Sequence, residues 1–156
     1  MTFDPERDLE ITRVIKAPPA AIWAAWTNAA SFEKWWIPAP ALCRVVELDV
    51  RPGGAMVTQM SEGEGQPFVS HMDACYLAVD EGRRIVFTNA LTGGYRPAEQ
   101  PFITGVITLE DHAEGTFYRA MAMHKTPQDR SMHSDLGFYD GWGAVTAQLA
   151  GLVEVR

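Results

Sequence analysis

The first regularity in the chain is an alternation of apolar and polar residues with the two-residue period of β-strands. The segment 44–50 is an example. Val46, Leu48 and Val50 share one parity, and acidic residues fill the two positions between them. Successive side chains of a strand point to opposite faces, so this pattern predicts a half-buried strand. Similar runs predict six further strands, at 9–16, 55–60, 68–79, 84–89, 102–110 and 116–124.

Two other regions have helical patterns. After Pro18-Pro19, the apolar segment 20–26 predicts a helix, and a second short helix is expected before Trp35-Trp36. Near the end of the chain, Thr126-Pro127 is typical of a helix start. No strong breaker other than glycine follows, so the sequence predicts one continuous helix from Pro127 to about Val153.

The order of these elements predicts an α+β fold. Short turns join most of the strands, which favours a curved antiparallel sheet of about six to seven strands. One face of such a sheet needs a helical cover, and the long C-terminal helix supplies it. The segment 92–101 is expected to be an irregular loop. Because no linker or repeat interrupts the chain, we expect a single domain over residues 1–156.

Glycine and aromatic residues are interleaved in the predicted C-terminal helix. The stretch GFYDGWGAV covers residues 137–145, and Phe138 and Trp142 lie four positions apart on one helical face. Each glycine inside a helix costs up to about 1 kcal/mol relative to alanine. Two explanations for these glycines remain open. The glycines, Gly141 among them, allow a close approach of the helix to the sheet, or they leave volume for a cavity.

Composition narrows the classes of partner. The net charge of −7 argues against nucleic acid, since phosphate contacts need clustered Lys and Arg. No apolar run is long enough for a membrane span, and the N-terminus lacks a signal-peptide pattern, so a cytoplasmic protein with reduced thiols is expected. The spacing of the Cys and His residues predicts no metal site, and no cofactor motif is present.

Six motifs occur in one order along the chain: TRV at 12–14, IWAAWT at 22–27, WWIP at 35–38, ELDVRPGG at 47–54, RIVFT at 84–88 and GFYDGW at 137–142. Together they resemble the activator of heat-shock-protein-90 ATPase homologue-like family, within the SRPBCC or START-like superfamily. The resemblance covers residues 9–153. It implies a helix-grip fold, in which the sheet wraps the C-terminal helix and an internal apolar cavity lies between them.

This resemblance favours the binding of a small hydrophobic molecule without catalysis as the leading hypothesis. Large aromatic and methionine side chains suit an adaptable apolar cavity. The expected ligand-binding residues are Trp26, Trp36, Met60, Phe87, Met121, Met123, Phe138 and Trp142.

Two alternatives remain. His71 and Asp73 lie two positions apart on one predicted strand and would share a face, which suits an acid–base pair in a polyketide cyclase or dehydratase-like enzyme. The family name instead suggests a module that binds a chaperone and activates its ATPase, although nothing in the sequence itself supports that partner. The sequence also leaves a homodimer open.

Overall fold

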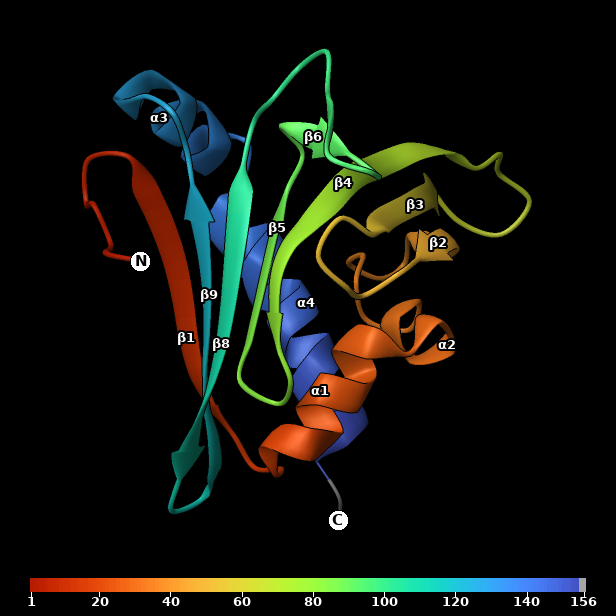
Figure 1. The fold of residues 1–156 in the computed structure, drawn as a ribbon. Helices are drawn as coiled ribbons and strands as arrows, with labels where there is room; N and C mark the ends of the chain where they lie inside the picture. The colour runs from red at the N-terminus through yellow and green to blue at the C-terminus, as the bar shows by residue number, and fades with distance from the viewer. Residues whose placement is uncertain (155–156) are drawn as a thin grey trace.

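A seven-stranded antiparallel sheet forms the centre of the computed structural model, which describes residues 1–154 (Figure 1). The strand order is β1-β9-β8-β5-β4-β3-β2. The predicted α+β fold is therefore confirmed, while residues 155–156 of the expected domain lie outside the described residues. The strands are β1 Asp8–Ile15, β2 Leu42–Leu48, β3 Ala55–Ser61, β4 Val69–Asp80, β5 Arg84–Thr88, β8 Thr104–His112 and β9 Gly115–Met123.

Two short helices follow β1, as predicted, but the C-terminal helix is divided. Gly137, between its two parts, has φ 98°, a left-handed conformation that glycine adopts without the cost of a Cβ. The prediction of one continuous helix was therefore wrong at this point. The helices are α1 Pro19–Thr27, α2 Ala29–Phe32, α3 Pro127–Asp135 and α4 Phe138–Val153.

The helices α1 and α4 pack on one face of the sheet, called here the inner face (Figure 1). Aromatic rings fill much of the space beneath them. The ring of Trp26 lies 4.8 Å from that of Trp35 and 6.3 Å from that of Phe87, and all three side chains are buried. Each fully buried large apolar side chain contributes about 1.5–3 kcal/mol, so this cluster is a major source of stability.

The opposite, outer face carries a separate apolar cluster. Val86, Val106 and Met121 form it, and Phe3 from the N-terminal segment packs against them together with Met123. Both methionines of β9 therefore lie on the face away from α4.

A β-bulge changes the expected parity of β2. Val45 pairs with Thr58 and Glu47 pairs with Val57, so Val46 has no partner in the ladder. Such an extra residue shifts the side-chain alternation by one. Val46 is 56% exposed, whereas Val45 packs against the core. The predicted shared face of Val46 with Leu48 and Val50 was wrong for this reason.

The segment expected to be irregular contains a small ladder. Residues Leu91–Thr92 (β6) pair antiparallel with Arg96–Pro97 (β7) in a two-stranded sheet of their own. Across residues 1–154, no helix combines the length and apolar character that a membrane crossing requires.

Candidate ligand-binding cavity

A cavity of about 330 Å³ remains between the sheet and the first half of α4. It lies at the end of the sheet where β5 ends and β8 begins, next to α3. The aromatic cluster fills the neighbouring space, so the cavity is an unfilled extension of the core. Its walls are formed by Trp36, Pro38, His71, Met72, Asn89, Phe102, Ile103, His133, Gly141, Trp142 and Val145.

Two tryptophans from distant parts of the sequence form one wall. The rings of Trp36 and Trp142 lie 6.0 Å apart in an edge-to-face arrangement. Gln148 of α4 fixes the segment that carries Trp36, because its amide group donates hydrogen bonds of 3.0 Å to the carbonyl oxygens of Trp35 and Ile37. The segment that carries Trp36 is therefore fastened to α4, the helix that carries Trp142.

Gly141 supports the second explanation of the glycine-rich helix. It lines the cavity, and a Cβ built at this position would meet no heavy atom within 4 Å among the described residues. A glycine that served close packing would instead have the sheet or another helix against its Cα. We therefore infer that the missing side chain at Gly141 leaves part of the cavity volume open.

A second β-bulge brings His71 to the inner face. Thr58 pairs with Met72, but the next residue, Gln59, pairs with Ser70, so His71 is left out of the ladder. The His71 ring lies at the rim of the cavity, 6.4 Å from that of Trp36, and its Nδ1 shares a 3.0 Å hydrogen bond with Oγ1 of Thr58. Desolvation by the surrounding protein lowers the pKa of His71.

Asp73 does not accompany His71. It pairs with Val57 and lines a different hollow beside Glu47 and Asp49. The shared face predicted for His71 and Asp73 was wrong, because the bulge at His71 interrupts the alternation. The acid–base pair expected for an enzyme is not formed by these two side chains.

Two cavity residues come from chain segments that the sequence did not single out. Oδ1 of Asn89, just after β5, accepts hydrogen bonds from the backbone N–H groups of Phe102 and Ile103, at 2.8 and 2.9 Å. These bonds fix the amide orientation, and its NH₂ group remains a donor that makes no hydrogen bond within residues 1–154. They also hold Phe102 against the cavity.

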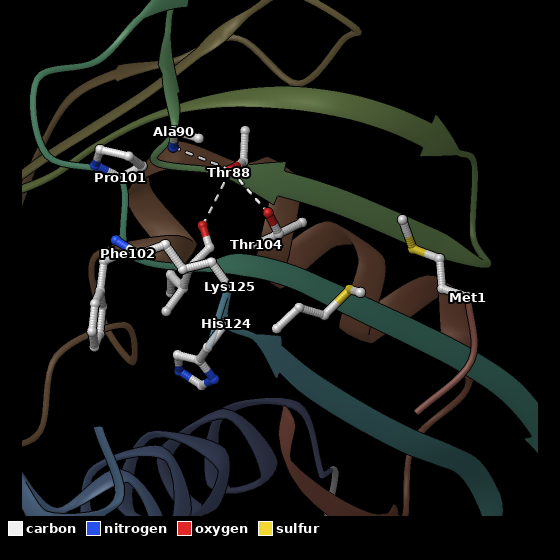
Figure 2. Close-up of a pocket in the computed structure, with 10 residues that line it drawn as sticks. Met1, Thr88, Ala90, Pro101, Phe102, Thr104, His124 and Lys125 are labelled. Carbon is white, nitrogen blue, oxygen red and sulfur yellow. Dashed lines mark hydrogen bonds between the residues drawn. The ribbon is translucent and has the colours of Figure 1, made fainter. Parts of the chain in front are cut away.

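His133 lies at the polar end of the cavity and is paired with a second histidine. Nδ1 of His133, on α3, lies 2.8 Å from Nε2 of His124, which follows β9. His124 itself lines a second hollow of about 400 Å³, here called the outer hollow, on the other side of Phe102 and Ile103. Figure 2 shows this hollow and the imidazole of His124, which extends from the end of β9 toward the helices.

Burial and the neighbouring His124 lower the pKa of His133 to about 4. An unfolded histidine titrates near pH 6.5, so between pH 6.5 and about 4 the unfolded state binds more protons than the folded state. Stability should therefore fall as the pH is lowered through this range. Between pH 7 and pH 4, the free energy of unfolding should fall in both proteins. We expect the fall in His133→Phe to be smaller than that in wild type by about 1–2 kcal/mol, after a reduction for solvent screening.

Urea unfolding at several pH values measures this difference, and His112→Phe, at an exposed histidine, is the control. Equal losses in wild type and His133→Phe would contradict the assigned environment of His133.

The structure distributes the expected ligand-binding residues over several places. Trp36 and Trp142 line the cavity. Trp26 and Phe87 are fully buried in the aromatic cluster, and Met60 packs against that core without lining the cavity. Phe138 is buried against Leu9 and Ala122 and stacks on Trp142 at 5.6 Å. Met121 and Met123 lie in the apolar cluster of the outer face.

Residues 1–154 contain no group of three or more His, Cys, Asp or Glu side chains arranged to hold a metal ion. The polar side-chain groups around the cavity are those of His71, Asn89 and His133, together with the indole N–H groups of Trp36 and Trp142. Their chemistry is that of neutral hydrogen-bonding groups.

Comparison with known proteins identifies the family. The sequence profile described as Activator of Hsp90 ATPase homolog 1-like protein matches residues 16–154. A crystal structure of a protein from Nitrosomonas europaea is 36% identical and covers 97% of both chains, with a TM-score of 0.87. A crystal structure of a protein from Chromobacterium violaceum is 24% identical and covers 96% of this chain and 99% of that chain, with a TM-score of 0.75.

A solution structure of the AHSA1-like protein from Aeromonas hydrophila shares the fold at 14% identity, with coverage of 94% and 92% and a TM-score of 0.70. The search of curated proteins gives no match. The family profile spans nearly the whole chain, and the helix-grip fold that the motifs implied is confirmed. The chain therefore belongs to the Activator of Hsp90 ATPase homolog 1-like family.

Proposed function

We propose that this protein binds one small, largely apolar molecule in the cavity between the sheet and α4. The observation that carries the proposal is about 330 Å³ of unfilled space with aromatic walls, directly beside a core that is otherwise filled by side chains. Cavities of this size, apolar with a few placed polar groups, are typical of small-molecule sites.

Burial of the ligand's apolar surface supplies most of the binding energy, at about 25 cal/mol per Å². The rings of Trp36, Phe102 and Trp142 provide the contact area. Because Gln148 and Asn89 already hold the surrounding backbone, little ordering is needed on binding, which favours affinity.

A two-ring aromatic probe tests this function. We expect 2-naphthol to bind one molecule per chain, with a dissociation constant on the order of 0.1 mM or tighter. Isothermal titration calorimetry at several temperatures should give a negative heat-capacity change, the signature of apolar burial. Absence of saturable binding of 2-naphthol and of its methyl ether would show that the proposed function is wrong.

A further inference from the structure

His133, at the polar end of the cavity, and His124 behind it form a chain of hydrogen bonds that starts at a backbone carbonyl. Nδ1 of His124 lies 2.8 Å from the carbonyl oxygen of Arg7. A carbonyl oxygen can only accept a hydrogen bond, so Nδ1 of His124 carries a proton. The hydrogen bond on one nitrogen of an imidazole decides the protonation of the other.

Neutral imidazole is the ordinary form of histidine at pH 8, and two imidazole nitrogens 2.8 Å apart require that one ring present a lone pair to the other. His124 is buried and His133 is half-buried, and neither forms an ion pair with a carboxylate within residues 1–154. Burial without a counter-charge disfavours the imidazolium form, in line with the lowered pKa of His133. Two cations lie near these histidines in sequence. Lys125 pairs with Asp129 at 3.5 Å, and Nε of Arg130 donates a hydrogen bond of 2.9 Å to the carbonyl oxygen of Asp8.

Neutrality fixes the positions of the remaining protons. Because the proton of His124 is on Nδ1, the Nε2 atom of His124 carries a lone pair. This lone pair accepts a hydrogen bond from the Nδ1–H group of His133, at 2.8 Å. The Nε2 of His133 is then unprotonated. It makes no hydrogen bond within residues 1–154, and the rings of Phe102 and Phe138, at 5.0 and 5.1 Å, hold the imidazole in place at the cavity wall.

We propose that Nε2 of His133 selects a ligand with an O–H or N–H donor, so that the cavity prefers a small neutral alcohol or phenol. This selection rests on the proposed function of the cavity. The free NH₂ donor of Asn89 complements it, because a hydroxyl group both donates and accepts. A carboxylate has only lone pairs to present to Nε2, and the net charge of −7 further disfavours an anion.

Three probes of the same ring size test the selection at pH 8. We expect 2-naphthol to bind at least tenfold more tightly than 2-methoxynaphthalene, which lacks the donor, and than 2-naphthoate, which is an anion. His133→Phe should remove the preference for 2-naphthol, so that the ratio of the affinities for 2-naphthol and 2-methoxynaphthalene falls to near one. His112→Phe, at the exposed histidine, should behave as wild type. Equal affinities of wild type for 2-naphthol and 2-methoxynaphthalene would overturn the proposal.

A second measurement needs neither ligand nor variant. Long-range ¹H–¹⁵N correlation spectra report the tautomer of each imidazole, and we expect His124 and His133 both to carry their proton on Nδ1 at pH 8. A proton on Nε2 of His133 would overturn the proposal even if 2-naphthol binds. If none of the probes bound, the proposed function would be wrong and the selection with it. A donor preference that survives in His133→Phe would leave the function standing and refute the role of His133.

Discussion

Replacing Trp26 with alanine is expected to lower the free energy of unfolding by about 3–5 kcal/mol. The Trp26 side chain is 1% exposed, and its ring contacts those of Phe32, Trp35, Trp36 and Phe87, with centroids 4.8 to 6.3 Å apart. Truncation removes this apolar burial and leaves a cavity that the surrounding rings cannot fill. Urea-induced unfolding measures the change.

Trp26→Phe and Tyr139→Ala complete the test. The indole N–H of Trp26 has no hydrogen-bond partner within residues 1–154, so phenylalanine should cost much less than alanine. Tyr139 is 52% exposed, and its truncation should change stability by no more than about 0.5 kcal/mol. A Trp26→Ala effect as small as that of Tyr139→Ala would show that this ring is not part of a packed core.

Replacing Gly141 with leucine is expected to weaken binding of 2-naphthol at least tenfold without loss of stability. The open space at this position lies in the cavity, so the new side chain occupies volume that the ligand needs. Leucine is also a better helix former than glycine by up to about 1 kcal/mol, which offsets small repacking costs. Titration calorimetry and urea unfolding of the same sample separate the two effects.

Gly143→Leu is the matched control. Gly143 lies on the same helix and also has no heavy atom within 4 Å of a built Cβ among the described residues, but it does not line the cavity. Wild-type affinity is expected for this variant. If Gly141→Leu also kept wild-type affinity, the ligand would bind elsewhere and the interpretation of Gly141 would be wrong.

The periodicity of the sequence predicted the fold well, because alternation and helical spacing directly reflect which side chains are buried. It failed at Val46 and His71, where a bulge inserts one residue into a strand. A bulge changes the parity of every later position, and no single-residue signal marks it. The predicted pairing of His71 with Asp73 depended on an uninterrupted strand.

The break at Gly137 did have a signal. Glycine is the preferred residue just after a helix C-terminus, where a left-handed conformation is common. The sequence interpretation placed this glycine inside a helix instead. The separate helix α3 carries His133, which lines the cavity and meets His124.

The remaining cavity residues could not have been found from local pattern. Asn89 and Phe102 lie outside the strands. They are 13 residues apart in sequence and are joined by a hydrogen bond from the backbone N–H of Phe102 to Oδ1 of Asn89. The prediction of Trp36 and Trp142 rested on aromatic character near the two covering elements, and both do line the cavity. Met121 and Met123 satisfied the same chemical criterion, but the strand register turns them to the outer face.

The most direct test of the proposed ligand site is a titration of ¹⁵N-labelled protein with 2-naphthol, followed through the indole N–H signals. The signals of Trp36 and Trp142 are expected to shift saturably, since both rings line the cavity, while that of Trp35, whose indole N–H donates to the carbonyl oxygen of Ala25, stays nearly unchanged. Saturable shifts confined to the backbone amides of Thr88 and Thr104 would place the probe in the outer hollow and contradict the account.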